Sequence, residues 1–151
     1  MKRRGFLGVL SGAAASLGIV PAAQAADAGA GHRVALQVDN NDAGTMNVAL
    51  HNAGNVLEHY AAAGGPASVE IVAYGPGLHM FRADTSPVKE PLAAFQAKSP
   101  GVVLSACDNT KRGMEKAEGK TIELLPGVRI VPSGVVRLME LQEQGWSYIR
   151  V

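Results

Sequence analysis

The sequence has only one cysteine, Cys107, among its 151 residues. A disulfide within the chain is therefore impossible, which is informative because small exported domains often rely on disulfides for stability. Without that covalent link, the hydrophobic core has to stabilise the fold alone.

Several familiar site patterns are also missing. The four histidines include no pair at a metal-binding spacing such as H-x-x-x-H, and no second cysteine is present to complete a zinc site. No glycine-rich loop is followed by Lys and Ser or Thr, the pattern that binds phosphate, and no G-x-S-x-G nucleophile elbow is present. The sequence therefore predicts neither a metal site nor a bound cofactor, and it argues against a Ser-His-Asp hydrolase.

The beginning of the chain does carry a recognisable pattern. Three basic residues at positions 2–4 precede an uncharged run from Gly5 to Ala26, and residues 23–25 read Ala-Gln-Ala. A charged, an apolar and a cleavage region in this order define a secretory signal peptide, and the paired arginines favour the twin-arginine route over the general one. We therefore predict a twin-arginine signal peptide over residues 1–25, a flexible lead-in over 26–32, a single domain over 33–151 and a periplasmic location.

The alternative for this segment is a membrane anchor. A spanning helix needs about 20 strongly apolar residues, whereas this run is rich in Gly, Ala and Ser and contains Pro21. No cysteine follows it that could carry a lipid. We expect no stable membrane anchor after cleavage.

Removal of the signal peptide changes the charge of the protein. Cleavage after Ala25 leaves 11 basic and 13 acidic residues, a net charge of −2. Nucleic acids and anionic membranes attract proteins with a basic excess, so neither is an expected partner. The remaining chain of about 125 residues has a common size for one domain with its own core.

Strand and helix patterns alternate along the rest of the chain. Short apolar runs predict strands at 34–38, 69–74, 102–106, 128–131 and 146–151. Apolar residues at helical spacing predict helices within 46–60, 87–98 and 135–141, and a further helix that begins near Cys107 and carries Met114 and Ala117.

Turn and capping residues separate these elements. Asp42 or Thr45 can cap the first helix, and Gly145 can end the last one. The Gly75-Pro76-Gly77 segment reads as a turn outside regular structure, with a short helix expected from Leu78 to Phe81.

The alternating order predicts the fold class. Largely continuous apolar strands that alternate with helices indicate a parallel sheet covered on both faces. Right-handed crossovers then favour an α/β fold: a three-layer α/β/α sandwich with a mainly parallel, roughly five-stranded, flavodoxin-like sheet.

Unusual residues follow three of the predicted strands. Ligands of such sheets bind outside the carboxyl ends of the strands, and in a parallel sheet these ends lie on one edge. We therefore expect a ligand-binding edge formed by residues from three separate loops: Asp39, Asn40 and Asn41; Gly75 and Gly77; and Cys107, Asp108 and Asn109.

Cys107 is the main candidate for chemistry. A thiol at a helix N-terminus lies near unpaired N–H groups and the positive end of the helix dipole, which both favour the reactive thiolate. Asp108 and Asn109 can cap the same helix, although the charge of Asp108 works against the thiolate. The alternative is a buried cysteine that serves as a small hydrophobic residue.

His79 follows the glycine-rich turn after the second strand. Its position allows it to lie near Cys107 and to modulate the pKa of the thiol, but a solvated loop histidine is the alternative reading. His51 and His59 lie on the first predicted helix and are expected at its surface.

Together these segments resemble the DsrE/DsrF-like family of small sulfur-relay proteins. The resemblance covers most of the predicted domain. It rests on the polar end of the first strand, on the order and spacing of the later motifs, and on the closing segment, which looks like a subgroup of exported or uncharacterised members. The motifs are Asp39-Asn40-Asn41, 69–78 (VEIVAYGPGL), 106–110 (ACDNT), 131–136 (VPSGVV) and 141–150 (LQEQGWSYIR).

The resemblance implies a three-layer α/β/α fold and a homo-oligomer, often a trimer or a hexamer. In the relay members a strand-end cysteine accepts sulfur as a persulfide and passes it to a partner protein, and Cys107 is the matching position. The well-understood relay members are cytoplasmic, whereas this chain has the pattern of an exported protein.

Two functions follow as hypotheses, and whether the protein is an enzyme stays open. The first is a sulfur carrier or sulfurtransferase-like protein that works through Cys107, with Asn109 orienting the sulfur, His79 sharing a proton, and a sulfur donor or acceptor protein as partner. The second is a non-catalytic small-ligand-binding or oligomeric assembly module that uses the same edge. The fold alone does not decide between them.

Overall fold

A computed structural model describes residues 31–151 of the chain. The predicted signal peptide (1–25) and most of the predicted lead-in (26–32) lie outside the described residues. The first strand begins at His32, one residue before the expected start of the domain. No helix within residues 31–151 is long and apolar enough to cross a membrane.

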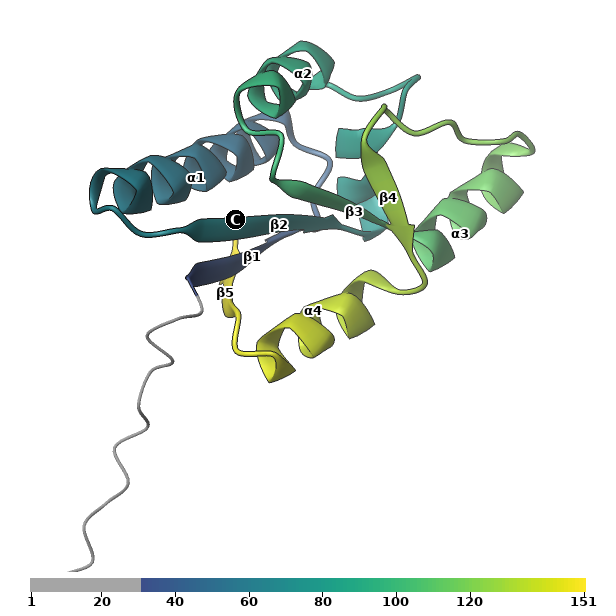
Figure 1. Cartoon of the computed structure of the whole chain (residues 1–151). Coiled ribbons are helices and arrows are strands. Elements are labelled where there is room, and N and C mark those ends of the chain that lie inside the picture. Colours follow the sequence, from purple (N-terminus) through teal and green to yellow (C-terminus); the bar gives the residue numbers. More distant parts are fainter. Residues whose placement is uncertain (1–30) are drawn as a thin grey trace, which may run out of the picture.

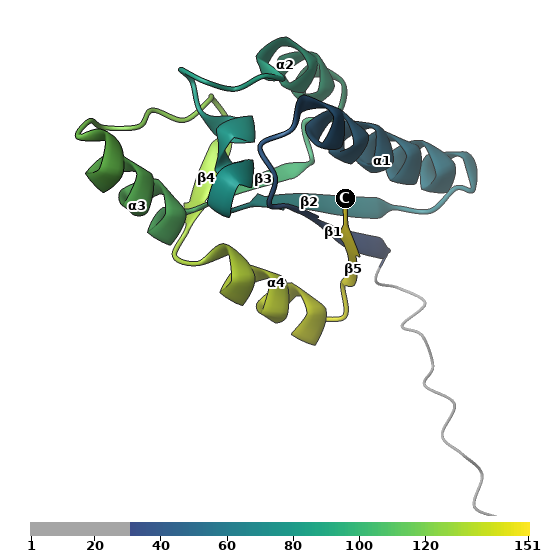
Figure 2. The same ribbon diagram turned by 180° about the vertical axis from the view of Figure 1, so that it is seen from behind.

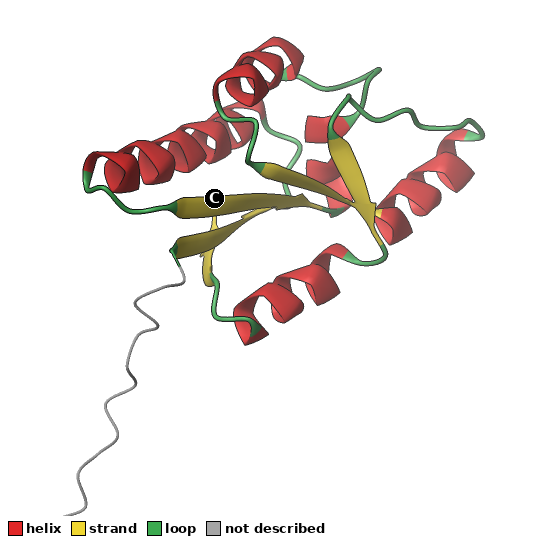
Figure 3. Cartoon of the chain, in the orientation of Figure 1, coloured by secondary structure: helices red, strands yellow, loops and turns green. Residues whose placement is uncertain are grey.

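Strands and helices alternate from end to end of the described chain (Figures 1 and 3). In chain order the elements are β1 (His32–Val38), α1 (Ala43–Ala62), β2 (Ala67–Ala73), the 3₁₀ helix η1 (Gly75–Phe81), α2 (Lys89–Lys98), β3 (Val103–Cys107), α3 (Asp108–Glu118), β4 (Val128–Val131), α4 (Gly134–Glu143) and β5 (Ser147–Arg150).

The five strands form one sheet in the order β4-β3-β2-β1-β5, and every neighbouring pair is parallel. The chain therefore moves across the sheet from β1 to β4 and then returns to place β5 on the other side of β1. The predicted α/β fold class with a parallel five-stranded sheet is confirmed.

The two faces of the sheet are covered unequally. Figures 1 and 2 show α1 and α2 on one face and α4 on the opposite face. Met114 of α3 packs against the same core cluster as α1, which places α3 with the first group. The second face has a small cluster in which Leu138 and Leu141 of α4 cover Ala35 and Val72.

Helix α1 illustrates how local sequence produces the layers. Its buried side chains recur at helical spacing, so one face of the helix packs on the sheet (Met46, Ala49, Leu50 and Ala53). Of the two expected caps, the structure uses Asp42, whose carboxylate accepts the N–H of Thr45 at 2.7 Å. Gly145, with a φ of 82°, follows the end of α4 as expected.

The expectation that residues 75–77 lie outside regular structure is wrong, because the 3₁₀ helix η1 begins at Gly75. The N–H of Gly77 donates to Tyr74 O at 3.1 Å, and Pro76 is acceptable in a first helical turn because its missing N–H is not needed there. A Cβ atom on Gly77 would lie 2.1 Å from Val38 O. This glycine therefore lets η1 pack directly against the end of β1.

A buried arginine ties the segment after η1 to α3. Arg82, 1% exposed, donates through Nε to Asp84 at 2.9 Å and through Nη2 to Glu118 at 2.8 Å. The hydrogen bonds from Arg82 lower the pKa of Glu118 to about 2. Lys120 also pairs with Asp84, at 2.9 Å.

Candidate functional site

Cys107 lies where the chain changes sides of the sheet. It is the last residue of β3, and Val131 at the end of β4 is its register partner. The helix that follows β3 packs with α1, whereas the helix that follows β4 covers the opposite face. The ends of β3 and β4 therefore form the topological switch point, where open α/β sheets bind their ligands.

The Cys107 sulfur is surrounded by hydrogen-bond donors from two helix N-termini. The backbone N–H groups of Asn109 and Thr110 come from the first turn of α3, and that of Gly134 comes from the first residue of α4. The hydroxyl of Thr110 is a further polar group that favours the charged form of the sulfur. These groups and the two helix dipoles stabilise negative charge on the sulfur.

Two opposing influences act on the acidity of this thiol. Burial is the larger single influence and raises the pKa of Cys107, which is 5% exposed. The hydrogen bonds from the Thr110 hydroxyl and from the N–H groups of Gly134, Thr110 and Asn109 outweigh it together, so the pKa lies below the ordinary value of a thiol. The site favours the thiolate.

Close packing fixes the position of the Gly134 donor. A Cβ atom at this residue would lie 3.0 Å from the Tyr74 side chain and 3.3 Å from Cys107 Cβ. Any larger residue at this position would force Tyr74 or Cys107 to move, so glycine allows the close approach of the α4 N-terminus. Thr110 is held from the other side, because its hydroxyl oxygen accepts the Gly75 N–H at 2.9 Å.

Sequence reasoning did not assign Tyr74, Thr110 or Gly134 to the site. One local signal was available: the third residue of a helix can reach back to the capping residue, as it does in a capping box. Thr110 has this spacing from Cys107, which is the N-cap of α3. The contribution of Gly134 depends on tertiary packing and has no local signal.

The predicted caps of α3 are wrong, because Cys107 is the N-cap residue and neither the Asp108 nor the Asn109 side chain caps the helix. The backbone N–H of Asn109 donates to Pro132 O at 3.4 Å and contributes to the lowered pKa of Cys107, while its side-chain oxygen accepts from Arg112 at 2.6 Å. Asp108 also pairs with Arg112, at 3.3 Å. Arg112 therefore draws both polar side chains toward the outer surface of α3.

His79 is not among the groups that lower the pKa of Cys107. It belongs to η1, and its Nδ1 lies 2.7 Å from the hydroxyl of Thr85. The expected proton-sharing role has no contact to support it.

The other predicted edge residues follow β1 and β2. Asp39 accepts from Gln37 at 2.9 Å and pairs with Arg150 of β5 at 3.0 Å, whereas Asn40 and Asn41 are exposed. Gly75 contacts the site through Thr110, and Gly77 packs under the end of β1. Because the sheet is parallel, the loops that carry these residues lie along the carboxyl edge together with Cys107.

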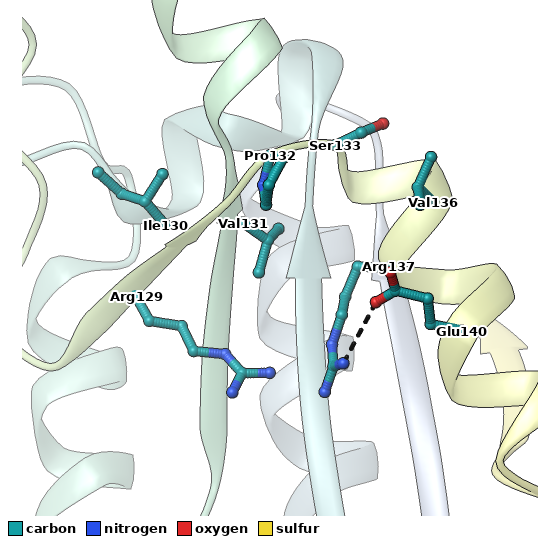
Figure 4. A pocket seen from close by; sticks show the side chains of 8 residues that line it. All are labelled: Arg129, Ile130, Val131, Pro132, Ser133, Val136, Arg137 and Glu140. Atoms are coloured by element: carbon teal, nitrogen blue, oxygen red, sulfur yellow. Dashed lines mark hydrogen bonds and ion pairs between the residues drawn. The ribbon is translucent and has the colours of Figure 1, made fainter.

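A cavity of about 240 Å³ opens between β4 and the first turns of α4 (Figure 4). Its wall includes Val131, Pro132 and Ser133, the segment that joins the register partner of Cys107 to Gly134. Arg129 and Arg137 also line it, and Figure 4 shows their guanidinium groups on the same side of the cavity. Cys107 itself does not line the cavity.

Metal ligands do not gather in this part of the protein. Within residues 31–151, no group of three or more His, Cys, Asp or Glu side chains is placed to hold a metal ion. The polar atoms around Cys107 are hydrogen-bond donors, which suit an anion rather than a cation.

The fold and the site define a parallel α/β domain with a cysteine at the end of an interior strand, next to the N-termini of two helices. A profile of the DsrE/DsrF-like family matches residues 16–151, so the chain belongs to this family. It is also similar to the solved structure of MTH1491 from Methanobacterium thermoautotrophicum, described as a protein of unknown function, with a TM-score of 0.67 and 30% identity over 80% of this chain and 99% of that one. No protein of curated function matches the chain.

Proposed function

We propose that this DsrE/DsrF-like protein carries sulfane sulfur as a persulfide on Cys107. The observation that supports this most directly is the set of donors around the sulfur, three backbone N–H groups and one hydroxyl, which lowers the pKa of the thiol. Membership of a family associated with sulfur relay points the same way.

The chemistry needs no external oxidant. The Cys107 thiolate attacks the outer sulfur of a sulfane donor, and a new S–S bond forms while the bond between that sulfur and the rest of the donor breaks. The leaving group departs with the electron pair. Attack by an acceptor thiolate on the outer sulfur of the persulfide restores the Cys107 thiolate, so a donor and an acceptor, which can be proteins, complete the cycle.

The same donors suit both states of the site. A persulfide is anionic on its outer sulfur, and N–H groups at helix N-termini stabilise such a charge as they stabilise the thiolate. We assign the thiolate-stabilising roles to Thr110, Asn109 and Gly134, through the contacts described above.

A second candidate function is favoured by the burial of the thiol. Cys107 is only 5% exposed, which suits a binding or assembly module in which the cysteine never reacts. In that case the carboxyl edge would bind a small ligand without covalent chemistry.

We also propose that the protein is a homo-oligomer whose contact includes α4. Val135 and Met139 are each 54% exposed and lie four residues apart, on a flank of the helix that does not line the cavity. A second copy of the chain is the proposed occupant, because the family resemblance implies a trimer or hexamer. Met139→Glu should lower the mass measured by light scattering, and Glu140→Gln, on the other flank, should not. An unchanged mass for Met139→Glu would exclude this contact.

We place this activity in the periplasm, on the strength of the twin-arginine pattern at residues 1–25. Fusion of these residues to a reporter that is active only after export tests the location. Replacement of Arg3 and Arg4 by lysine should abolish export if the twin-arginine route is used. Continued export of that variant would indicate the general route.

Mass spectrometry tests the carrier function. The purified protein is incubated with inorganic polysulfide, freed of excess reagent and weighed intact. A carrier gains one sulfur atom, the gain disappears in Cys107→Ser, and a small acceptor thiol removes it. A wild-type protein that gains no sulfur, while remaining folded by circular dichroism, would support the binding module instead.

A further inference from the structure

A buried carboxylate holds two arginines beside the cavity near Cys107. Glu70, in the centre of β2, is 1% exposed and accepts from Arg137 through both oxygens, at 2.9 and 2.8 Å. It also accepts from Arg129 Nη2 at 2.6 Å and from Ser105 at 2.7 Å. Burial raises the pKa of Glu70, but the hydrogen bonds from Arg137, Ser105 and Arg129 outweigh it, and the carboxylate stays charged.

The ionic group of Glu70, Arg129 and Arg137 is not explained by a contribution to the stability of the fold. Apolar residues of similar size are often as stabilising as a buried ion pair, or more so, because two charges have to be desolvated. What the group does achieve is orientation: Glu70 and Ser105 fix the two guanidinium planes, since Arg129 Nε also donates to Ser105 at 2.9 Å. The arginines are therefore held in place before any ligand arrives.

Both arginines keep hydrogen-bonding capacity toward the cavity. The Arg129 side chain is 45% exposed, and among the described residues its Nη1 has no hydrogen-bond partner. Arg137 Nη1 has only a long contact of 3.5 Å with Glu140, whose side chain is 51% exposed and free to turn toward solvent. Glu140 is the one carboxylate that lines the cavity. Preorganised guanidinium groups of this kind bind oxyanions through paired N–H donors.

The distance to the thiol matches a small ligand. Ser105 and Cys107 are two residues apart on the same face of β3, which separates their side chains by about 7 Å. Arg129 Nε is 2.9 Å from Ser105 Oγ, and Val131, the register partner of Cys107, lines the cavity. Because Cys107 does not itself line the cavity, a ligand held by the guanidinium groups through its oxygen atoms has to extend past Val131 to meet the thiol.

We propose that this cavity binds a small sulfur oxyanion of the thiosulfate class and presents its outer sulfur to Cys107. The proposal rests on the proposed function, because it names the donor of the sulfur that Cys107 accepts. The volume of about 240 Å³ accommodates an anion of this size together with water, and apolar side chains that include Val131 and Val136 form part of the wall.

The transfer step is balanced without another reagent. The Cys107 thiolate attacks the outer sulfur of thiosulfate, the new S–S bond forms, and the bond between the two thiosulfate sulfurs breaks. Sulfite leaves with the electron pair, so the total charge is the same before and after the step. Arg129 and Arg137 then stabilise the charge that accumulates on the sulfite oxygens.

Binding is measured first without transfer. Thiosulfate is titrated into the full chain carrying Cys107→Ser and followed by calorimetry or NMR chemical shifts. Adding Arg129→Gln should weaken binding at least about tenfold, as expected for loss of hydrogen bonds to a charged group. Arg33→Gln, which removes an arginine that bonds Gln144 O and does not line the cavity, should leave binding unchanged.

A second pair of variants leaves the ionic group intact. Val136→Trp fills the cavity and should abolish thiosulfate binding. Val48→Trp is the control: Val48 of α1 is 47% exposed, as Val136 is, and its replacement should leave thiosulfate binding unchanged. Circular dichroism checks that each variant is folded. Absence of saturable binding, or equal binding by Val136→Trp and Val48→Trp, would overturn the proposal.

Sulfur loading then separates the two proposals. In the Cys107 protein, Val136→Trp should slow loading from thiosulfate at least tenfold and should change loading from polysulfide little, because polysulfide has no oxygens for the arginines. If the protein loads sulfur from polysulfide, and Val136→Trp and Val48→Trp load from thiosulfate at the same rate, the thiosulfate site is refuted and the carrier function is not. No loading from either reagent refutes the carrier function, and with it the donor role of a bound oxyanion.

Discussion

Thr110 is the side chain whose replacement should change the thiol most selectively. Its hydroxyl lowers the pKa of the Cys107 thiol and accepts the Gly75 N–H at 2.9 Å. Thr110→Val keeps the shape of the side chain and removes both contacts, whereas Thr110→Ser keeps the hydroxyl and is the matched control.

The expected magnitude follows from the strength of these contacts. A hydrogen bond to a charged group contributes about 1.5–3 kcal/mol, and about 1.4 kcal/mol corresponds to a factor of ten. Because the backbone donors of Asn109, Thr110 and Gly134 remain, we take the lower end and expect the thiolate-to-thiol ratio to fall about tenfold in Thr110→Val. The Gly75 N–H also loses its acceptor, which should reduce the free energy of unfolding by about 1 kcal/mol.

The assay is the pH dependence of Cys107 alkylation by iodoacetamide. The wild-type rate should reach its plateau below the pH expected for an ordinary thiol, because the pKa of Cys107 is lowered. In Thr110→Val the whole profile should move to higher pH, and in Thr110→Ser it should stay near wild type. Superimposable profiles for the wild type and Thr110→Val would show that the hydroxyl does not stabilise the thiolate.

Two further predictions concern the scaffold. Gly77→Ala should destabilise the protein by about 3 kcal/mol or more in urea unfolding, since its Cβ would lie 2.1 Å from Val38 O. Gly113→Ala in α3, where nothing lies within 4 Å, should stabilise the protein by about 0.5–1 kcal/mol. Equal stabilities of the two variants would contradict the close approach of Gly77 to β1. The pKa of Glu118 falls from 4.5 to about 2 on folding, so its contribution to stability is complete above the unfolded value and disappears as the pH drops toward 2. Arg82→Met should flatten that acid-side decline, as followed by thermal unfolding at a series of pH values, and an unaltered slope would refute it.

The architecture could be predicted from the sequence because it depends on local patterns. Apolar runs such as 34–38 and 102–106 lie within or one residue from β1 and β3, and turn residues separate them from helices with clear periodicity. Cys107 was placed at the junction of a strand and a helix for the same reason, and it ends β3. Parallel strands buried on both faces leave few other arrangements.

The donors around the sulfur could be predicted only in part. The first turn of α3 follows from local sequence, so the N–H groups of Asn109 and Thr110 were within reach of sequence reasoning. The N–H of Gly134 arrives from α4, because the chain crosses to the opposite face between β4 and β5. The prediction that Asp108 or Asn109 caps α3 was wrong because Arg112, one turn further along the helix, binds both side chains.

The arginine-lined cavity had no signal in the sequence. Glu70 lies 59 residues from Arg129 and 67 residues from Arg137. These residues meet only because β2, β3 and β4 are neighbours in this order and α4 crosses behind them. Glu70 and Arg129 are each a single charged residue inside an apolar run, and a buried carboxylate requires partners that the local sequence does not identify.

The late position of α4 in the chain also affects folding. Helix α4 and β5 complete the sheet through pairs such as Val34 with Ser147, which are far apart in sequence and slow to form. Until this connection docks, Cys107 has neither the N–H of Gly134 nor the cover that α4 provides. Brief pulses of a thiol-labelling reagent during refolding should therefore label Cys107 until α4 and β5 dock. The time at which labelling stops then measures when the sheet is completed.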